Sequence, residues 1–351
     1  MSQVRIHELL SFAVQHKASD IHLAAGEVPS VRIDGDVRRL DLEILGPDDA
    51  RRLAYSIMNE KQKSRFENDF EVDFSIGLQG LARFRVNVFT HARGVGMVLR
   101  QIPSRVLSLE ELGAPPVFHQ IAGAKKGLVL ITGPTGSGKS TSLAAIIDHI
   151  NKTRAEHILT IEDPIEFVHT AHKCLINQRE VGSHTKSFSV ALRSALREDP
   201  DVILVGEMRD LETVSLALTA AETGHLVFGT LHTNSAPETI DRIIDAYPHE
   251  QQAQVRTMLS VSLKAVVTQT LIRKDRGPGR VAAHEVMIVN TAIRNLIREN
   301  KLYQIPSIMQ ASKGEGMQLM SASVRSLVDR GLVSRERAIS VMNNPKLFEE
   351  G

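Results

Sequence analysis

Apolar residues in the first hundred positions recur with the periods of both helices and strands. Ile6, Leu9 and Leu10 begin a three-to-four-residue spacing, so residues 4–17 are predicted to form an amphipathic helix. The other expected elements are strands at 20–24, 28–34, 70–76, 81–90 and 96–102, turns at 34–36 and 78–80, and a helix at 48–59. This order predicts a small α+β domain over residues 1–102.

Polar and apolar side chains alternate along residues 81–90. Because successive side chains of a strand point to opposite faces, one face of this segment is expected in a core and the other outside it. The apolar set is Ala82, Phe84, Val86 and Val88, and the polar set is Arg83, Arg85 and Asn87. Arg100 lies in the next predicted strand. Taken alone, these arginines indicate a solvated strand face.

The pattern changes after residues 103–118, a stretch with three prolines that we interpret as a linker. Strands and helices then alternate, which predicts a mainly parallel sheet with helices on its faces. The expected segments are 127–132, 139–151, 157–161, 188–198, 201–206, 210–221 and 225–231, followed by helices at 237–246, 250–272 and 291–299 and two more after 317. A second domain, mostly helical in its final third, is therefore predicted over residues 119–351.

The first strand of this alternating region runs into a glycine-rich loop. Residues 133–140 read Gly-Pro-Thr-Gly-Ser-Gly-Lys-Ser and fit the pattern G-x-x-x-x-G-K-[ST]. A strand, such a loop and a helix N-terminus together present backbone N–H groups to phosphate. We expect Lys139 to reach the β- and γ-phosphates and the Ser140 hydroxyl to bind Mg²⁺. The expected nucleotide contacts are Gly133, Pro134, Thr135, Gly136, Ser137, Gly138, Lys139, Ser140 and Thr141.

Acidic residues follow two other predicted strands. The apolar run 201–206 ends at Glu207, which is expected to hold Mg²⁺ directly or through water. The strand near 158–161 runs into Glu162, Asp163 and Glu166. Hydrolysis of a nucleotide needs a carboxylate that orients or deprotonates water, and this acidic segment supplies candidates. A solvated acidic loop is the alternative interpretation.

The predicted strand 225–231 has a histidine at each end. His232 follows the strand at a position where a sensor of the γ-phosphate can lie, whereas His225 begins it. Since the chain contains 14 histidines, most are expected to be structural or solvated.

Four segments resemble the motifs of the secretion-type ATPases of the RecA-like P-loop class. Residues 133–140 look like their Walker A motif, 160–166 like their Asp box, 204–210 like their Walker B motif and 224–233 like their His box. We include His225 among the candidates for nucleotide binding.

Two further segments resemble the branch of this family that retracts type IV pili. Residues 18–23 read Ala-Ser-Asp-Ile-His-Leu, and residues 292–299 read Ala-Ile-Arg-Asn-Leu-Ile-Arg-Glu. With one cysteine, the chain has no four-cysteine metal motif of the kind found in the pilus extension ATPases, and we expect it to lack their additional N-terminal domain as well. The resemblance implies a RecA-like P-loop ATPase domain preceded by a smaller PAS-like α+β domain.

The resemblance also implies an activity and an assembly. The expected protein is a Mg-dependent, hexameric ATPase that uses ATP to depolymerise pilin and drive twitching motility. Its expected partners are an inner-membrane pilus platform protein and an accessory retraction ATPase. It would be cytoplasmic and peripheral at the inner membrane, at the pilus base.

Roles for individual side chains follow from the same resemblance. Glu166 is the expected general base, with Glu162 and Asp163 in support. The candidates for arginine fingers that reach a neighbour's nucleotide are Arg83, Arg85 and Arg100, with Arg197 and Arg209 as alternatives.

Composition narrows the classes of function and of binding partner that remain open. Lys plus Arg (42) nearly balance Asp plus Glu (41), so the net charge of +1 gives no support to nucleic-acid or membrane binding by bulk charge. The single cysteine excludes an internal disulfide and a cysteine zinc cluster. No apolar run approaches the ~18–20 residues of a membrane span, and the N-terminus lacks the apolar core of a signal peptide. We therefore expect no nucleic-acid partner and no membrane insertion.

Three alternatives stay open. An assembly or secretion ATPase of the same fold differs only in its direction of work, which the chemistry does not encode. A RecA-like nucleic-acid motor requires a local basic patch hidden in the average charge. A non-catalytic, nucleotide-gated scaffold is disfavoured by the presence of Lys139, Ser140, Glu166 and Glu207.

Overall fold

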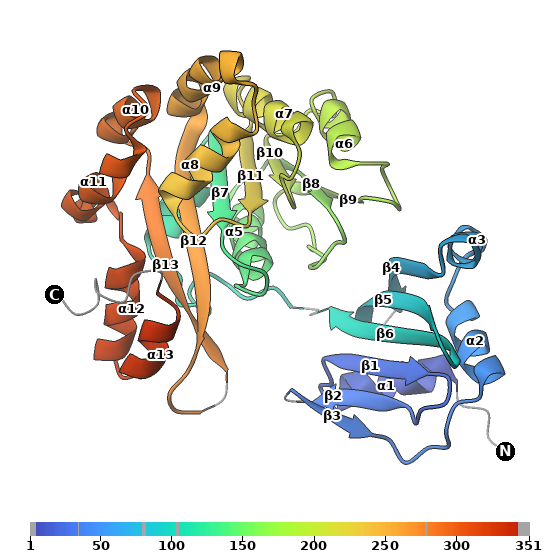
Figure 1. Cartoon of the computed structure of the whole chain (residues 1–351). Helices are drawn as coiled ribbons and strands as arrows, with labels where there is room; N and C mark the ends of the chain where they lie inside the picture. The colour runs from blue at the N-terminus through green and yellow to red at the C-terminus, as the bar shows by residue number, and fades with distance from the viewer. Residues whose placement is uncertain (1–4, 34, 79–81, 103–104, 278, 343–351) are drawn as a thin grey trace. The chain divides into compact units, whose positions relative to one another are not determined.

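The chain folds into two compact units, shown in Figure 1. The computed structural model describes residues 5–33, 35–78, 82–102, 105–277 and 279–342. The first unit comprises Met1–Arg105 and Pro164–Phe167, and the second comprises Val106–Asp163 and Val168–Gly351. Each unit is described by itself below.

The first unit contains a six-stranded antiparallel sheet with the strand order β3-β2-β1-β6-β5-β4. Its elements are α1 (Ile6–Gln15), β1 (Asp20–Ala24), β2 (Ser30–Ile33), β3 (Asp36–Arg39), α2 (Pro47–Tyr55), α3 (Glu60–Asp69), β4 (Glu71–Leu78), β5 (Ala82–His91) and β6 (Gly94–Ile102). The predicted alternation along β5 is confirmed: Phe84, Val86 and Val88 are buried in the core, while Arg85 and Asn87 are exposed.

Two elements of this unit were not predicted. Asn59 caps the N-terminus of α3: its side chain accepts a hydrogen bond from the Gln62 backbone N–H, and the Gln62 side chain accepts one from the Asn59 backbone N–H. This reciprocal cap separates α3 from α2, so the expected single helix at 48–59 is wrong in its end. Strand β3 was also missed. The expected turn residue Asp34, residues 79 and 80 of the expected hairpin turn and residue 81 of the strand expected after it lie outside the described part of the chain.

The second unit is built on a seven-stranded sheet with the order β13-β12-β7-β11-β10-β8-β9. Its strands are β7 (Gly127–Thr132), β8 (His157–Glu162), β9 (Leu175–Glu180), β10 (Val202–Val205), β11 (Leu226–Leu231), β12 (Leu263–Arg273) and β13 (Arg280–Ile288). All neighbouring pairs are parallel except β12 and β13. The prediction of an α/β fold with a mainly parallel sheet is confirmed.

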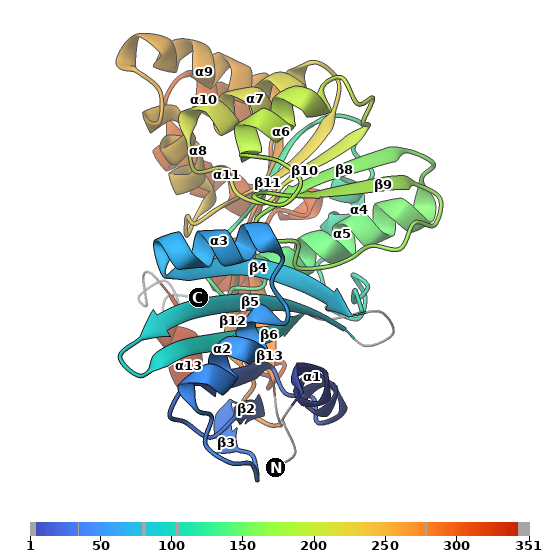
Figure 2. The same cartoon turned by 90° about the vertical axis from the view of Figure 1, so that its right-hand side faces the viewer.

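Helices cover both faces of this sheet because its strands are apolar on both sides. Leu128 and Leu130 of β7 belong to one core cluster, and Val129 and Ile131 belong to the cluster on the other face. The helices are α4 (Val117–Ala122), α5 (Lys139–Thr153), α6 (Phe188–Ala195), α7 (Leu211–Glu222), α8 (Ala236–Asp245), α9 (His249–Ser262), α10 (Thr291–Arg298), α11 (Ile305–Ala311), α12 (Met320–Asp329) and α13 (Arg335–Ser340). Figure 2 shows α5 on one side of the parallel strands and α6 and α7 on the other.

The prediction of a helix over 250–272 is confirmed as far as Ser262 and wrong beyond it. Helix α9 ends at Ser262, and β12 begins at Leu263 and runs beside β7. Val266 and Val267 of β12 are both fully buried, on opposite faces of the sheet. A continuous apolar run of this kind does not distinguish a buried strand from a buried helix, and β-branched residues favour the strand. With its antiparallel partner β13, this strand makes the final third of the chain a mixture of sheet and helices.

The single cysteine, Cys174, lies in the core of the second unit. It is 4% exposed, and its Sγ donates a hydrogen bond to Arg154 O over 3.1 Å. Burial raises the pKa of the Cys174 thiol. Across the part of the chain that the structure describes, no helix has the length and apolar character needed to span a bilayer.

Candidate active site

The glycine loop connects the end of β7 to the start of α5. Gly133 and Gly138 adopt φ angles of +135° and +86°, which side-chain-bearing residues rarely tolerate. A Cβ at Gly133 would lie 2.2 Å from the backbone oxygen of Gln269, and one at Gly138 would lie 2.8 Å from the Gln269 side-chain nitrogen. Glycine is therefore required at these two positions by both conformation and space.

Lys139 begins α5 and folds back over the loop. Its Nζ donates hydrogen bonds to Gly133 O at 2.8 Å and Pro134 O at 3.1 Å. Ser137 is 3% exposed, and its hydroxyl has no hydrogen-bond partner within the described residues. An ammonium group, a run of backbone N–H groups and a helix N-terminus thus converge, which is the arrangement that binds phosphate.

Two residues that contact this loop were missed by the sequence analysis. Gln269 of β12 contacts the loop through its side-chain amide, and Arg280 Nη1 of β13 lies 3.4 Å from Gly136 O. Neither belongs to a sequence motif, and the apolar pattern over 250–272 predicts a helix where the structure has β12. Only the pairing of β12 with β7 brings Gln269 to the nucleotide loop.

The parallel register gathers three more expected site residues at the same edge of the sheet. Leu231, the last residue of β11, lies opposite Thr132 at the end of β7. Val205, the last residue of β10, lies opposite Ile161 of β8. His232, Glu207 and Glu162 therefore all lie at the carboxyl ends of strands, the edge from which the glycine loop emerges.

Glu207 and His232 contact each other at this edge. Glu207 Oε1 lies 3.0 Å from His232 Nε2, and the same oxygen accepts a hydrogen bond from Arg209 Nε. That hydrogen bond raises the pKa of Arg209 above its usual value. The carboxylate is thus held by two nitrogen groups in one orientation.

The acidic segment after β8 divides between the two units. Glu162 Oε1 accepts hydrogen bonds from Thr160 Oγ1 at 2.6 Å and Gln178 Nε2 at 3.1 Å. Asp163 follows in the same unit as the glycine loop, whereas Glu166 belongs to the Pro164–Phe167 segment that groups with the first unit. Glu162 therefore lies at the carboxyl edge of the sheet, and the role of Glu166 as general base stays a prediction.

The three candidate arginine fingers all lie in the first unit. Arg83 Nη2 donates to Ser75 Oγ at 2.7 Å, Arg85 Nε donates to Asp73 Oδ2 at 3.1 Å, and Arg100 Nε donates to Asp20 Oδ1 at 2.8 Å. Asp20 is buried, and although burial acts to raise its pKa, hydrogen bonds from Arg100 and Ser19 bring it below its usual value. The arginines share one sheet, and their approach to a nucleotide stays a prediction.

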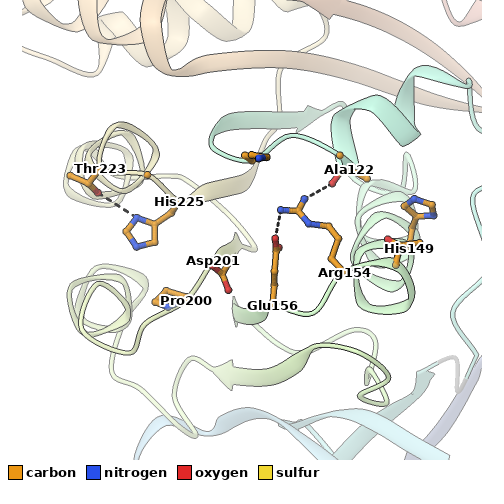
Figure 3. Close-up of a pocket in the computed structure, with 12 residues that line it drawn as sticks. Ala122, His149, Arg154, Glu156, Pro200, Asp201, Thr223 and His225 are labelled. Atoms are coloured by element: carbon orange, nitrogen blue, oxygen red, sulfur yellow. Dashed lines mark hydrogen bonds and ion pairs between the residues drawn. The ribbon is translucent and has the colours of Figure 1, made fainter.

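The structure corrects the expectation for His225. This residue precedes β11, so it lies at the amino ends of the strands, about 20 Å of strand away from His232. Its Nδ1 lies 2.9 Å from Ala220 O. His225 lines a cavity of about 680 Å³ together with Pro200 and Asp201. Figure 3 shows these three residues in that pocket. His225 therefore does not join the nucleotide site within its own chain.

The donor set fits the expected magnesium ion. Ser140 offers a hydroxyl at the N-terminus of α5, and Glu207 offers a carboxylate at the end of β10. The described residues contain no group of three or more His, Cys, Asp or Glu side chains suited to a metal. Mg²⁺ in nucleotide sites takes most of its ligands from phosphates and water, so one or two protein oxygens suffice.

The loop, its sheet and the acidic strand end define a nucleotide-binding protein of the P-loop class. Comparison with known proteins carries the assignment further. The chain belongs to the family described as "Type II/IV secretion system protein", whose model matches residues 2–340.

The chain is similar to named members of this family over almost its whole length. It is 59% identical over 343 residues to the type IV pilus retractation ATPase PilT of Pseudomonas aeruginosa, covering 98% of this chain and 99% of that protein. It is 57% identical over 310 residues to a twitching motility protein of Neisseria gonorrhoeae, covering 88% of this chain and 83% of that one. The crystal structure of the pilus retraction motor PilT with bound ADP matches with a TM-score of 0.94 at 52% identity, covering 99% and 100% of the two chains.

Proposed function

We propose that this protein is an ATPase motor that hydrolyses ATP to power type IV pilus retraction and twitching motility. One observation carries the proposal: a complete phosphate-binding loop shares a sheet edge with the Glu207–His232 pair. The chain that holds this site is similar, from end to end, to a protein named as a pilus retraction ATPase.

The second unit supplies the nucleotide site. The backbone of residues 133–138 and the N-terminus of α5, which includes Thr141, surround the phosphates, and Lys139 neutralises charge that develops on the transferred group. Ser140 and Glu207 would hold Mg²⁺, which when bound neutralises phosphate charge and fixes the phosphate geometry. His232, held at 3.0 Å from Glu207, is positioned to respond to the presence of a γ-phosphate.

The acidic segment supplies the base. Glu166 accepts the proton of the attacking water, and Glu162 and Asp163 support it by orienting that water. Glu162 Oε1 already accepts hydrogen bonds from Thr160 and Gln178. Because this oxygen is occupied, a supporting role for Glu162 is favoured over that of the base.

The motor is a homo-hexamer with a PAS-like N-terminal domain at 1–102, a linker at 103–118 and a RecA-like ATPase domain at 119–351. Arg83, Arg85 and Arg100 act as arginine fingers on a nucleotide in another subunit. Hydrolysis changes the angle between the two domains, and the ring passes this motion to an inner-membrane pilus platform protein. The motor works in the cytoplasm at the base of the pilus, where an accessory retraction ATPase also acts.

Deletion of the gene in its host tests the direction of work. Loss of a retraction motor leaves pili that extend and never shorten, so hyperpiliated cells that do not twitch are expected. Bald cells would instead assign the protein to pilus extension. Complementation with Lys139→Ala is the matched control, because the substitution removes the ammonium group that turnover requires. Restored twitching by this variant would contradict the proposal.

A further inference from the structure

Gln269 lies inside β12, and its side chain spans the space between that strand and the glycine loop. The residue is 2% exposed. Its Nε2 donates a hydrogen bond to Ser137 O over 2.6 Å, and its Oε1 accepts one from Ser142 Oγ over 2.7 Å. One amide therefore ties β12 both to the loop and to the first turn of α5.

The loop is packed closely around this side chain. Gly133 and Gly138 have no room for a Cβ because the backbone oxygen and the amide nitrogen of Gln269 occupy the space. One residue earlier in each strand, the hydroxyls of Thr132 and Thr268 lie 2.9 Å apart. The end of β7 and the loop that follows are thus fastened to β12 at consecutive positions.

The hydrogen bond to Ser137 O has a consequence for the nucleotide. In a planar trans peptide the C=O and the next N–H point in opposite directions. Because Gln269 holds the Ser137 carbonyl toward β12, the N–H of Gly138 points away from β12. The N–H groups of such a loop are its phosphate ligands, so the orientation of this peptide decides whether the ligand set is complete.

We propose that Gln269 is a positioning residue of the ATP site, which fixes the glycine loop in its phosphate-binding conformation through the Ser137 carbonyl. Gln269 touches no substrate itself; it acts through the loop. Without its amide, the buried Ser137 carbonyl loses its donor and the peptide is free to rotate. The inference rests on the proposed ATPase activity.

Gln269→Met tests the inference in the purified full-length protein. Methionine keeps the volume and removes both hydrogen bonds. We expect the KM for ATP to rise about tenfold and kcat/KM to fall about 10²-fold, since small misplacements of a binding group have effects of this size. The rise in melting temperature caused by ADP should shrink as well. The control is Gln318→Met, which removes a comparable hydrogen bond, from Gln318 Nε2 to His284 O over 2.8 Å, without contacting the loop.

Gln269→Glu provides a second readout that a packing role would not change. An ionised carboxylate places an acceptor against the Ser137 carbonyl, whereas a protonated carboxyl group donates a hydrogen bond as the amide does. Burial raises the pKa of an introduced carboxyl group. The ratio of the variant's kcat/KM to that of the wild type should therefore rise as the pH is lowered below neutrality.

The outcomes separate the inference from the proposed function. Wild-type protein without ATP turnover would overturn the proposed function. Active wild type, with KM and kcat unchanged in folded Gln269→Met, or changed equally in Gln318→Met, would overturn the role of Gln269. If Gln269→Met does not fold, the pH dependence of Gln269→Glu decides, and a constant ratio across pH would contradict the inference.

Discussion

Arg85 lies directly opposite Arg100 across strands β5 and β6. Two like charges at such a pair repel each other, and here each guanidinium is matched by a carboxylate, Asp73 beside Arg85 and Asp20 beside Arg100. The sheet of the first unit therefore holds two fixed cations side by side. This is the arrangement expected if they meet the phosphates of a nucleotide bound to another subunit.

Replacing either arginine should slow ATP turnover without weakening ATP binding. A finger stabilises charge that develops only in the transition state, so Arg85→Ala or Arg100→Ala should lower kcat by up to about 10³–10⁵-fold. Steady-state kinetics and a nucleotide-binding titration measure the two quantities. The control is Arg32→Ala, because Arg32 also pairs with Asp20, at 3.8 Å, but is not a proposed finger. Mixing Arg85→Ala with Lys139→Ala protein should restore turnover, and no rescue at any ratio would contradict action between subunits.

The choice of base within the acidic segment can be tested by amide substitution. Glu166→Gln should bind Mg-ATP and hydrolyse it about 10²–10⁴-fold more slowly, because the amide keeps the shape and cannot take a proton. Single-turnover measurements separate this loss from a loss of binding. The control is Glu156→Gln, at the opposite edge of the sheet, which should hydrolyse ATP at the wild-type rate. If Glu162→Gln stops hydrolysis and Glu166→Gln does not, Glu162 is the base.

Buried histidines should make the second unit sensitive to acid. Burial lowers the pKa of His284 to about 4, from 6.5 in the unfolded chain. The unfolded state then binds more protons, so stability is complete above pH 6.5 and is lost as the pH falls toward 4. Each such group contributes about 3 kcal/mol across this interval. His169, with its pKa also lowered to about 4 by burial, acts in the same direction.

Denaturant melts at several pH values measure this effect. His284→Met should reduce the dependence of the unfolding free energy on pH, and His169→Met should reduce it further when the two are combined. A wild-type protein whose stability does not change between pH 6.5 and pH 4 would contradict the low pKa of both groups.

Substitutions on the charged side of helix α10 should abolish retraction while leaving ATP hydrolysis largely intact. Ile293 and Ile297 on its apolar face are fully buried, Leu296 is partly buried, and Arg298 is exposed. Arg294 is partly buried, and its Nε has no hydrogen-bond partner in the described part of the chain. It lies near Lys264, whose pKa is lowered first by burial and then by Arg294 and Lys126. Such a concentration of positive charge suits an acidic partner.

Arg294→Gln combined with Arg298→Gln should therefore keep most of the ATPase activity and abolish twitching. ATP turnover of the purified protein and a motility assay of cells that carry the variant measure the two effects. Lys301→Gln removes a charge from the neighbouring segment and should leave motility intact. Normal twitching by the double variant would give this helix a packing role only.

The sequence predicted those parts of the molecule whose signals are local. The loop at 133–140 carries its own conformational requirements in its glycines, and the strands beside it are apolar runs of the right length. Glu207 and His232 could be placed at one edge because the carboxyl ends of parallel strands coincide. Their contact at 3.0 Å follows from the same register.

The parts that were missed depend on long-range pairing. Gln269 reaches the loop only because β12 lies beside β7, which is more than a hundred positions away in the chain. The residues next to Gln269 in the sequence form no motif that would indicate a functional role for its amide. The apolar run of β12 resembles a buried helix until the pairing partner is known. By contrast, α3 was missed although Asn59 and Gln62 form a recognisable cap. The prediction for His225 is wrong because His225 and His232 belong to one sequence motif but lie at opposite ends of β11.

Because Cys174 is buried, the protein is well suited to site-specific labelling experiments that follow its movement. The chain has a single thiol, and that thiol is enclosed in the core with a raised pKa, so it reacts slowly with maleimides. Cysteines introduced at the exposed positions Val37 of the first unit and Tyr303 of the second would be the reactive ones. A pair of fluorophores at these sites can report the distance between the units through a catalytic cycle, without any prior removal of native cysteines.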